Sequence, residues 1–270
     1  MCKIVLEGKT AVITGASTGL GRRLALDLAE RNVKLVLASR NVEALNEVAV
    51  ELGLDSSSLC VQKTDVSDAE QCEKLIKRTI QNFHKIDFLI LNAGISMWVR
   101  FDEITNMSIF KTLMETNYMG AVNCIYPALT YLRQNKGTIV AVSSAQAVMG
   151  MPNHTAYTAS KHALRGFLES LEMEIGDSVR ILNVMPGWIR DTNIRANALR
   201  GDGNPTGWSR KHNRYAVSLE SCSAQILRAM ESGAREIYIP SSLRFLPWLK
   251  LVAPGWVRAR IKRAANQQDG

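Results

Sequence analysis

The chain has 270 residues, 46% of them hydrophobic and 21% charged, a composition typical of one folded α/β domain with a large core. Its formal charge of +8 is concentrated at the end, with six basic and no acidic side chains between positions 244 and 268, whereas a nucleic-acid-binding face would spread basic residues among stacking aromatic rings. The five cysteines and four histidines are scattered, so we expect neither a disulfide framework nor a metal centre.

The first residues do not resemble a targeting signal. Glu7 and Lys9 interrupt the apolar start before it could form the core of a signal peptide. No apolar run approaches the roughly 20 residues that span a bilayer. We therefore expect a protein of the cytoplasm, either free in solution or held peripherally at a membrane surface.

A glycine-rich turn follows the first predicted strand, Thr10–Thr14. It has the spacing G-x-x-x-G-x-G, with Gly15, Gly19 and Gly21, and a helical pattern continues over residues 22–31. Backbone N–H groups in such a turn can approach a pyrophosphate, and the helix N-terminus adds partial positive charge. Glycines can also serve only a tight turn. Their place directly after the first strand favours a dinucleotide site.

The second predicted strand, Lys34–Ser39, is followed by Arg40 and not by a carboxylate. An acidic residue near this point binds the adenosine ribose of NAD, whereas an arginine suits the 2′-phosphate of NADP. The guanidinium of Arg40 matches phosphate geometry, and Ser39 lies beside it. A solvated arginine is the alternative. The pattern favours NADP(H) over NAD(H).

Alternating strands and helices continue along the chain and predict an α/β fold with a doubly wound parallel sheet. The further elements are expected at Val42–Leu52, 58–64, 69–82, Phe88–Leu91, 109–133, 137–142 and 180–185. Ligands of such sheets bind at the carboxyl ends of the strands. Asp65 and Val66 stand at one such end, where they could hold an adenine edge or where Asp65 could cap the next helix.

A helix predicted from Tyr157 onward carries Lys161 one turn later on the same face, and Ser144 follows the fifth strand. An ammonium beside a phenol is expected to lower the phenol pKa from about 10, so that the phenol can exchange protons near neutrality. Ser144 would fix a carbonyl or alcohol oxygen beside the phenol. This set suits proton transfer to a carbonyl oxygen while hydride reaches its carbon. A solvated i,i+4 pair is the alternative.

These motifs together resemble the classical form of the short-chain dehydrogenase/reductase family. The resemblance rests on Thr14-Gly15-x-x-x-Gly19-x-Gly21, Asp65, Asn92-Ala93-Gly94, Asn117, Ser144, Tyr157-x-x-x-Lys161 and Pro186-Gly187, in this order. It implies that Tyr157 is the acid/base and that Ser144 orients the substrate oxygen. It also implies that Lys161 lowers the tyrosine pKa and binds the nicotinamide ribose, and that Asn117 holds a water in a proton relay.

The resemblance further implies a set of cofactor contacts. These are Gly15, Ser17, Thr18, Gly19, Leu20, Gly21, Ser39, Arg40, Asp65, Val66, Asn92, Ala93, Gly94, Tyr157, Lys161, Pro186, Gly187, Ile189 and Thr192. Pro186-Gly187 would approach the nicotinamide, and Thr192 would bind its carboxamide.

The segment after Pro186 is expected to select the substrate, and residues 188–215 are predicted to form a lid. Its glycine-rich stretch, 201–207, is interpreted as flexible and flanked by helical pieces, able to close over the substrate and exclude water. An insertion without a role is the alternative. A helix at 218–232 and a strand at 236–240 follow, so residues 1–242 are predicted to form a single Rossmann-type domain.

The tail, residues 243–270, mixes apolar bulk with basic charge. Pro247, Lys250 and Pro254 prevent a spanning helix, and short broken amphipathic segments suit a membrane interface with acidic headgroups. Packing on the sheet edge or on a sister subunit is an equal alternative. The tail resembles the family branch that includes 11β-hydroxysteroid dehydrogenases and acyl-dihydroxyacetone-phosphate-type lipid reductases.

Two functions are compatible with these features. One is an NADP(H)-dependent oxidoreductase that moves hydride between nicotinamide and a lipophilic ketone or secondary alcohol of steroid or acyl-lipid type. The other is a catalytically idle NADP-binding sensor or scaffold. All four catalytic positions are filled, which favours the enzyme. We expect a small-molecule substrate, no nucleic acid, and a homodimer or homotetramer.

Overall fold

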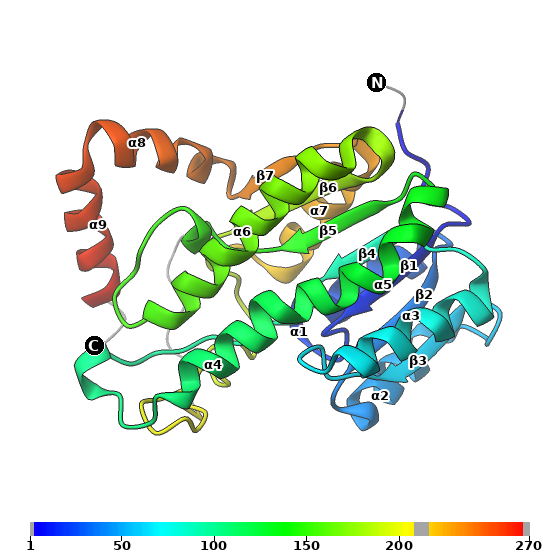
Figure 1. Ribbon diagram of the computed structural model, residues 1–270, viewed down its shortest axis with the longest axis horizontal. Coiled ribbons are helices and arrows are strands. Elements are labelled where there is room, and N and C mark those ends of the chain that lie inside the picture. The colour runs from blue at the N-terminus through cyan, green and yellow to red at the C-terminus, as the bar shows by residue number, and fades with distance from the viewer. Residues whose placement is uncertain (1–2, 208–215, 267–270) are drawn as a thin grey trace.

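A computed structural model of the chain describes residues 3–207 and 216–266. In this part seven strands form one parallel sheet in the order β3–β2–β1–β4–β5–β6–β7 (Figure 1). The strands are β1 (Thr10–Thr14), β2 (Lys34–Ser39), β3 (Leu59–Lys63), β4 (Phe88–Leu91), β5 (Thr138–Val142), β6 (Arg180–Pro186) and β7 (Glu236–Ile239). The predicted doubly wound parallel sheet is confirmed.

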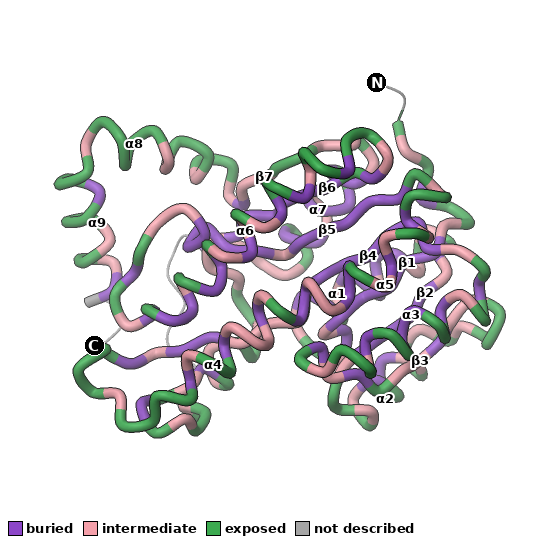
Figure 2. The backbone as a smooth tube through the Cα atoms, in the orientation of Figure 1, coloured by how far each residue is buried: buried purple, intermediate pink, exposed green. Residues whose placement is uncertain are grey.

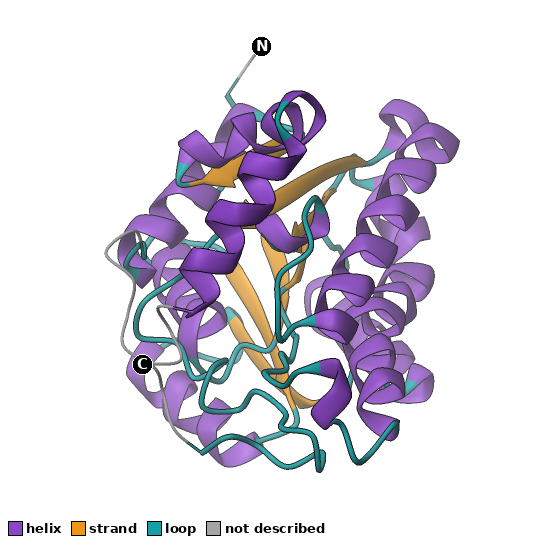
Figure 3. Cartoon of the chain, turned by 90° about the vertical axis from the view of Figure 1, so that its left-hand side faces the viewer, coloured by secondary structure: helices purple, strands orange, loops and turns teal. Residues whose placement is uncertain are grey.

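Helices cover both faces of the sheet (Figure 3). The first group packs α3 (Ala69–Phe83), α5 (Gly120–Gln134) and α6 (Thr155–Ile175) on one face. The second packs α1 (Gly19–Ala29), α2 (Val42–Leu52) and α7 (Leu219–Ser232) on the other. The remaining α-helices of the described part are α4 (Ser108–Met114), α8 (Leu246–Val252) and α9 (Pro254–Asn266).

Each strand supplies side chains to both cores, because successive side chains of a strand point to opposite faces. In β1, Val12 belongs to the core beneath α3, α5 and α6, whereas Ala11 and Ile13 belong to the core beneath α1, α2 and α7. A parallel sheet is buried on both faces, which explains why its strands are continuous apolar runs in the sequence. Full burial of each Val or Ile contributes about 1.5–3 kcal/mol.

The strand order reverses beside β1. The chain builds outward from β1 to β3 and then returns to place β4 on the other side of β1. Ligands of open α/β sheets bind in the crevice at such a reversal, at the carboxyl ends of the strands. Gly15 follows β1 and Asn92 follows β4, so the fold brings the predicted cofactor residues of these two strands to one place.

Most helices match their predicted bounds to within one or two residues, and two differ further. α1 begins at Gly19 instead of residue 22, because Gly19 and Gly21, which are typical of a turn in sequence, lie inside its first turn. The helix predicted at 109–133 contains a π-helical turn, Glu115–Met119, between α4 and α5. One extra residue in a helical turn does not disturb an apolar pattern enough to be predicted, yet such turns are frequent at functional sites. Asn117 lies in this turn.

The segment between β6 and α7 is tied to the loop that follows β4. Leu199 pairs with Met97, and the carbonyl oxygen of Gly201 accepts hydrogen bonds from the N–H groups of Thr105 (3.0 Å) and Asn106 (2.9 Å). The helical pieces predicted beside residues 201–207 are wrong within 188–207. The backbone there forms turns, such as the hydrogen bond from the N–H of Asn197 to the carbonyl oxygen of Asn193, and also bonds to the loop after β4, so no helical ladder develops. Lid closure stays a prediction, and residues 208–215 lie outside the described part.

Helices α8 and α9 extend away from the sheet (Figure 1), and most of their surface is exposed (Figure 2). Lys250 Nζ donates to the carbonyl oxygen of Val148 at 3.1 Å, and Val257 is buried. Trp248 and Leu251, by contrast, are 69% and 77% exposed. No helix in the described residues is long and apolar enough to cross a bilayer.

Candidate active site

The glycine turn after β1 has the geometry of a phosphate cradle. Gly15 has φ +65°, and a Cβ added there would lie 2.9 Å from the Cα of Ala93; at Gly21 an added Cβ would lie 2.2 Å from the carbonyl oxygen of Gly15. Thr18, the residue before α1, makes no side-chain cap, and the first turn of α1 has no acidic residue. The helix N-terminus therefore keeps its partial positive charge available for an anion.

A hydrogen-bond network holds this turn against the end of β4. Thr14 Oγ1 accepts from the N–H groups of Asn92 (3.0 Å) and Ala93 (3.1 Å). In return, Asn92 Nδ2 donates to the carbonyl oxygens of Thr14 (3.0 Å) and Gly15 (3.1 Å). Asn92 thus braces the turn itself. The sequence analysis named Thr14 as part of the motif but did not predict that it holds β1 to β4. Its position as the last residue of β1 was the signal for that role.

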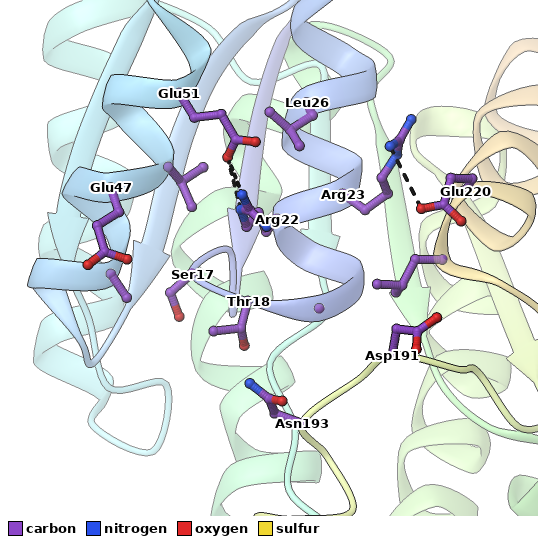
Figure 4. Close-up of a pocket in the computed structure, with 14 residues that line it drawn as sticks. Ser17, Thr18, Arg22, Arg23, Leu26, Glu47, Glu51, Asp191, Asn193 and Glu220 are labelled. Carbon is purple, nitrogen blue, oxygen red and sulfur yellow. Dashed lines mark hydrogen bonds and ion pairs between the residues drawn. The ribbon is translucent and has the colours of Figure 1, made fainter. Parts of the chain in front are cut away.

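A cavity of about 550 Å³ lies beside the turn, bordered by α1, α2, α7 and the loop after β6 (Figure 4). Three of the predicted cofactor residues line it: Ser17, Thr18 and Gly19. Arg22 also lines it and donates through Nε and Nη2 to Glu51 Oε2, at 2.9 and 2.6 Å. The helix N-terminus in its wall suits the phosphate part of a dinucleotide, whereas the carboxylates of Glu47, Glu51, Asp191 and Glu220 line other parts of the cavity.

The adenosine end of the predicted site is open to solvent. Arg40 is exposed, forms no ion pair with any described residue and does not line the cavity, while Ser39 Oγ donates to the carbonyl oxygen of Asn41 at 3.1 Å. Asp65 Oδ1 accepts from the N–H and Oγ of Ser67, at 3.0 and 2.7 Å. The residue that caps α3 is Asp68 and not Asp65. Asp65 therefore stabilises the turn that presents Val66.

Four side chains converge at the carboxyl ends of β4 and β5. Asn117, Ser144, Tyr157 and Lys161 are all buried. Ser144 hydrogen-bonds to Tyr157, and Lys161 Nζ lies 5.8 Å from the centre of the Tyr157 ring and donates to the carbonyl oxygen of Val142 at 3.2 Å. The fold therefore brings together the tyrosine, serine and lysine that the sequence predicted as one group.

The π-helical turn positions Asn117 against the loop after β4. Its Oδ1 accepts from the N–H of Ile95 at 2.9 Å, and its Nδ2 donates to the carbonyl oxygen of Ile95 at 2.9 Å and to Ser160 Oγ at 3.0 Å. Ser160 Oγ in turn donates to the carbonyl oxygen of Tyr157 at 2.8 Å. Sequence reasoning missed Ser160; its place one residue before Lys161 on α6 was the only signal.

Burial acts on both titratable groups of this cluster. It raises the pKa of Tyr157, and the hydrogen bond with Ser144 opposes that effect; burial lowers the pKa of Lys161 to about 8. The sequence predicted a lowered phenol pKa from a neighbouring ammonium. In the folded chain the loss of water around both groups is the larger effect, because each is almost fully enclosed. Lys161 therefore loses its proton at a lower pH than an ordinary lysine.

The loop after β6 reaches the glycine turn. The N–H of Gly187 donates to the carbonyl oxygen of Ile239 at 2.8 Å, Ile189 pairs with Val217, and Thr192 lies about 3.8 Å from the position of a Cβ on Gly19. Thr192 thus borders the predicted cofactor site. Gly94 lies between Asn117 and Lys161, since its added Cβ would be 3.2 Å from Asn117 Oδ1 and 3.7 Å from Lys161 Nζ.

Apolar and aromatic side chains surround the tyrosine. Trp98 packs edge-on against His154 at 4.8 Å between ring centres, and His154 packs against Tyr157 at 5.8 Å. Tyr157 also belongs to a buried cluster with Met97, Val99, Ile109, Leu113 and Ala156. Sequence reasoning missed Trp98 and His154. His154 stands three residues before Tyr157, so helical spacing could have placed it on the same face.

Comparison with known proteins identifies the family of this chain. A family model described as short chain dehydrogenase matches residues 9–202. The 11-beta-hydroxysteroid dehydrogenase A of Arachis hypogaea is 35% identical, over 92% of this chain and 73% of its own. The 11-beta-hydroxysteroid dehydrogenase-like 2 of Arabidopsis thaliana is 33% identical, over 92% of this chain and 79% of its own.

Solved structures share the whole fold. A short chain dehydrogenase from Burkholderia cenocepacia in complex with NADP superposes with a TM-score of 0.79 at 25% identity, over 96% of this chain and 99% of that one. A short chain dehydrogenase/reductase from Burkholderia phymatum in complex with NAD superposes with a TM-score of 0.77 over 90% of this chain and 94% of that one, and at 22% identity it shows the fold alone. The chain belongs to the short chain dehydrogenase family and is a dehydrogenase/reductase that acts on CH–OH and C=O groups.

Proposed function

We propose that this protein transfers hydride between NADP(H) and a lipophilic ketone or secondary alcohol, with Tyr157 as its acid/base. The observation that carries the proposal is the convergence of three buried side chains: Ser144 opposes the rise in the pKa of Tyr157, and Lys161 Nζ lies 5.8 Å from the centre of the Tyr157 ring. When bound, the nicotinamide would supply or accept the hydride. The residues that would hold the cofactor are those of the glycine turn, together with Arg40, Asp65, Val66 and Thr192.

In the direction of reduction, the Oη–H of Tyr157 donates its proton to the substrate oxygen as the carbonyl carbon becomes tetrahedral. Ser144 donates a hydrogen bond to the same oxygen and keeps it beside the phenol. The phenolate that remains is stabilised by the ammonium of Lys161, whose pKa of about 8 makes it able to return a proton near neutrality. Asn117, fixed by Ile95 and Ser160, would hold the water that reloads Lys161.

The preference for NADP(H) rests on the end of β2. Arg40 is exposed there, no carboxylate stands in its place, and no described residue forms an ion pair with it. A guanidinium in this situation can bind a 2′-phosphate without first giving up a protein partner. The similar Burkholderia cenocepacia protein was solved with NADP, which supports the same preference.

The lipophilic substrate is supported by the apolar wall around Tyr157. Met97, Val99, Ile109 and Leu113 are buried there. Apolar side chains enclosing the reacting group favour a substrate with a large hydrocarbon part. The Arachis relative is named a hydroxysteroid dehydrogenase and the Arabidopsis relative hydroxysteroid dehydrogenase-like, and these names favour the steroid type of substrate.

Loss of NADPH absorbance with a panel of ketosteroids, retinals and acyl-chain ketones tests the proposal. An enzyme of this kind is expected to oxidise NADPH with at least one lipophilic ketone. An idle NADP-binding sensor or scaffold would bind NADPH and oxidise it with none of the panel.

We also propose that the tail rests on a membrane surface. Aromatic and aliphatic side chains are exposed there, among them Phe245, Trp248, Leu251, Val252 and Trp256. Arg260 stacks on the ring of Trp256 at 5.6 Å, so basic charge lies next to the apolar surface. This combination suits the interface of an anionic bilayer. We propose residues 1–242 as the catalytic domain in a cytoplasmic homodimer or homotetramer, with the tail as its membrane contact.

A further inference from the structure

Arg195, in the loop between β6 and α7, is a partly buried residue whose guanidinium has no carboxylate partner in the described part of the chain. Its Nη1 and Nη2 atoms are shielded from solvent, and neither has a hydrogen-bond partner among residues 3–207 and 216–266. In the same part of the chain, no Asp or Glu oxygen lies within ion-pair distance of this guanidinium. A buried guanidinium remains charged near neutral pH, so it destabilises the fold unless an anion compensates it.

Three other arginines of the described part have a carboxylate partner. Arg23 and Arg165 also have one shielded nitrogen each, but Arg23 binds Asp27 at 2.6 Å and Arg165 binds Glu169 at 2.6 Å. Arg200, only five residues from Arg195, binds Asp202 at 2.9 Å. Arg195 differs from all three, and burial lowers its pKa where a carboxylate would raise it.

The backbone of Arg195 lies in sequence between two anchors, one at the glycine turn after β1 and one at the buried cluster around Tyr157. On one side, Thr192 borders Gly19; on the other, Leu199 pairs with Met97, which packs in the cluster of Tyr157. Arg195 is three residues from the first anchor and four from the second, so it lies within about 14 Å of each. Thr206 Oγ1 donates to its carbonyl oxygen at 2.8 Å, which holds the loop in place.

We propose that Arg195 binds an acidic group of the substrate, so that the enzyme acts on a lipophilic ketone or secondary alcohol that also carries a carboxylate, sulfate or phosphate. This proposal rests on the proposed function and adds the charge of its substrate. The planar fork of a guanidinium pairs with two oxygens of such a group. The apolar wall around Tyr157 would then hold the hydrocarbon part, and Arg195 would set the distance from the acidic group to the reacting carbon.

The test compares matched pairs of ketones that differ only in charge. The pairs are a keto fatty acid and its methyl ester, a ketosteroid sulfate and its parent steroid, and an alkyl ketone phosphate and its uncharged alcohol. Binding is measured by calorimetry on the NADPH-loaded protein, and turnover by loss of NADPH absorbance. In at least one pair, the charged member is expected to bind ten times or more tighter than the neutral one, the scale of a charge-assisted hydrogen bond.

Arg195→Gln is expected to remove this preference and to leave affinity for the neutral member within about twofold. Arg200→Gln, the matched control on the same loop, is expected to preserve it, because Arg200 already has Asp202 as a partner.

Arg195→Gln is also expected to melt at the same temperature as wild type or higher, since it removes an uncompensated charge. If Arg195 were instead needed for the fold, the substitution would lower the melting temperature. Should Arg195→Gln not fold, Arg195→Lys, which keeps the charge but not the fork, replaces it and is expected to bind the charged member less tightly than wild type.

Three results would overturn the proposal: no preference for a charged member in any pair, a preference that survives Arg195→Gln, or a loss of NADPH affinity in that variant. The last would assign the cation to a cofactor phosphate. Binding that prefers the charged member without any NADPH oxidation would refute the proposed oxidoreductase function and leave the anion site standing.

Discussion

Lys161 is a fully enclosed lysine, and its environment makes the stability of the protein depend on pH. Burial lowers its pKa from 10.5 to about 8. Between these values the unfolded chain binds more protons than the folded one, so the contribution of Lys161 to stability is most unfavourable below about pH 8 and improves as pH rises towards 10.5. The raised pKa of Tyr157 acts in the opposite sense only above about pH 10.

We therefore expect the difference in unfolding free energy, wild type minus Lys161→Met, to rise by about 2–3 kcal/mol between roughly pH 7 and pH 10. Urea denaturation of both proteins at the two pH values measures it, and groups that titrate alike in both proteins cancel. A difference that does not change with pH would show that Lys161 is solvated as an ordinary ammonium.

The proposed preference for NADP(H) depends on Arg40. If it pairs with the 2′-phosphate, Arg40→Ala should weaken NADPH binding at least tenfold more than NADH binding, because a charge-assisted contact contributes about 1.5–3 kcal/mol. Arg180 is an exposed arginine at the amino end of β6, away from the ligand edge of the sheet, and Arg180→Ala is the control. Titration of both nucleotides by calorimetry measures the ratio. Equal losses for both nucleotides would make Arg40 a solvated surface residue.

At the scale of elements, the start of α1 depends on the lack of a side chain at Gly21. A Cβ there would lie 2.2 Å from the carbonyl oxygen of Gly15, and a backbone atom cannot move away without distorting the cradle. Gly21→Ala is expected to weaken NADPH binding by at least tenfold, or about 1.4 kcal/mol. Gly166→Ala, in the middle of α6 with no atom near its added Cβ, is expected instead to stabilise the fold by about 0.5–1 kcal/mol. Unchanged NADPH affinity in Gly21→Ala would contradict the cradle.

The tail consists of two helices, α8 and α9, and the sequence did not decide whether they pack on a membrane or on protein. On an anionic bilayer, each basic side chain near the surface adds about 1 kcal/mol, and exposed charges are screened within about 10 Å at 0.1 M salt. The protein should therefore co-sediment with anionic vesicles at low salt, less at high salt, and hardly at all with neutral ones.

Trp248→Ala with Trp256→Ala should weaken vesicle binding, because both exposed rings would lose buried apolar area on the bilayer. Exposed aromatic residues elsewhere provide the control pair, Phe101→Ala with Tyr126→Ala. If the tail packs on protein instead, no vesicle will bind and the two tryptophan substitutions will lower the melting temperature.

Sequence patterns predicted the sheet of the whole molecule better than its loops. β1, β2 and β4 occupy the residues predicted for them, because a buried parallel strand is a short apolar run between polar turns. The position of Asn117 in a π-helical turn was not predictable, since the apolar face hardly changes. The helical piece expected before Gly201 is not present in residues 188–200, and the carbonyl oxygen of Gly201 bonds to residues about a hundred positions earlier in the chain.

The predicted catalytic group also has features that the sequence predicted and features that it did not. Spacing alone placed Lys161 one turn after Tyr157, and strand order placed Ser144 at the same edge of the sheet. The effect of burial on the two pKa values could not be predicted, because it depends on packing from segments distant in sequence. The anion site at Arg195 was invisible for the same reason: a sequence does not show which arginine lacks a carboxylate.

In the proposed mechanism, hydride transfer by the whole protein depends on the proton of Tyr157. Tyr157→Phe removes this proton while keeping the ring in its buried cluster. With a ketone that the wild-type protein reduces, this variant is expected to lose a hundredfold or more of turnover, the scale of general acid catalysis. Its NADPH affinity is expected to remain within about twofold, because the ring and Lys161 stay in place. Tyr126→Phe, on the exposed face of α5, is the control and should be fully active. Near-normal turnover by Tyr157→Phe would contradict the account.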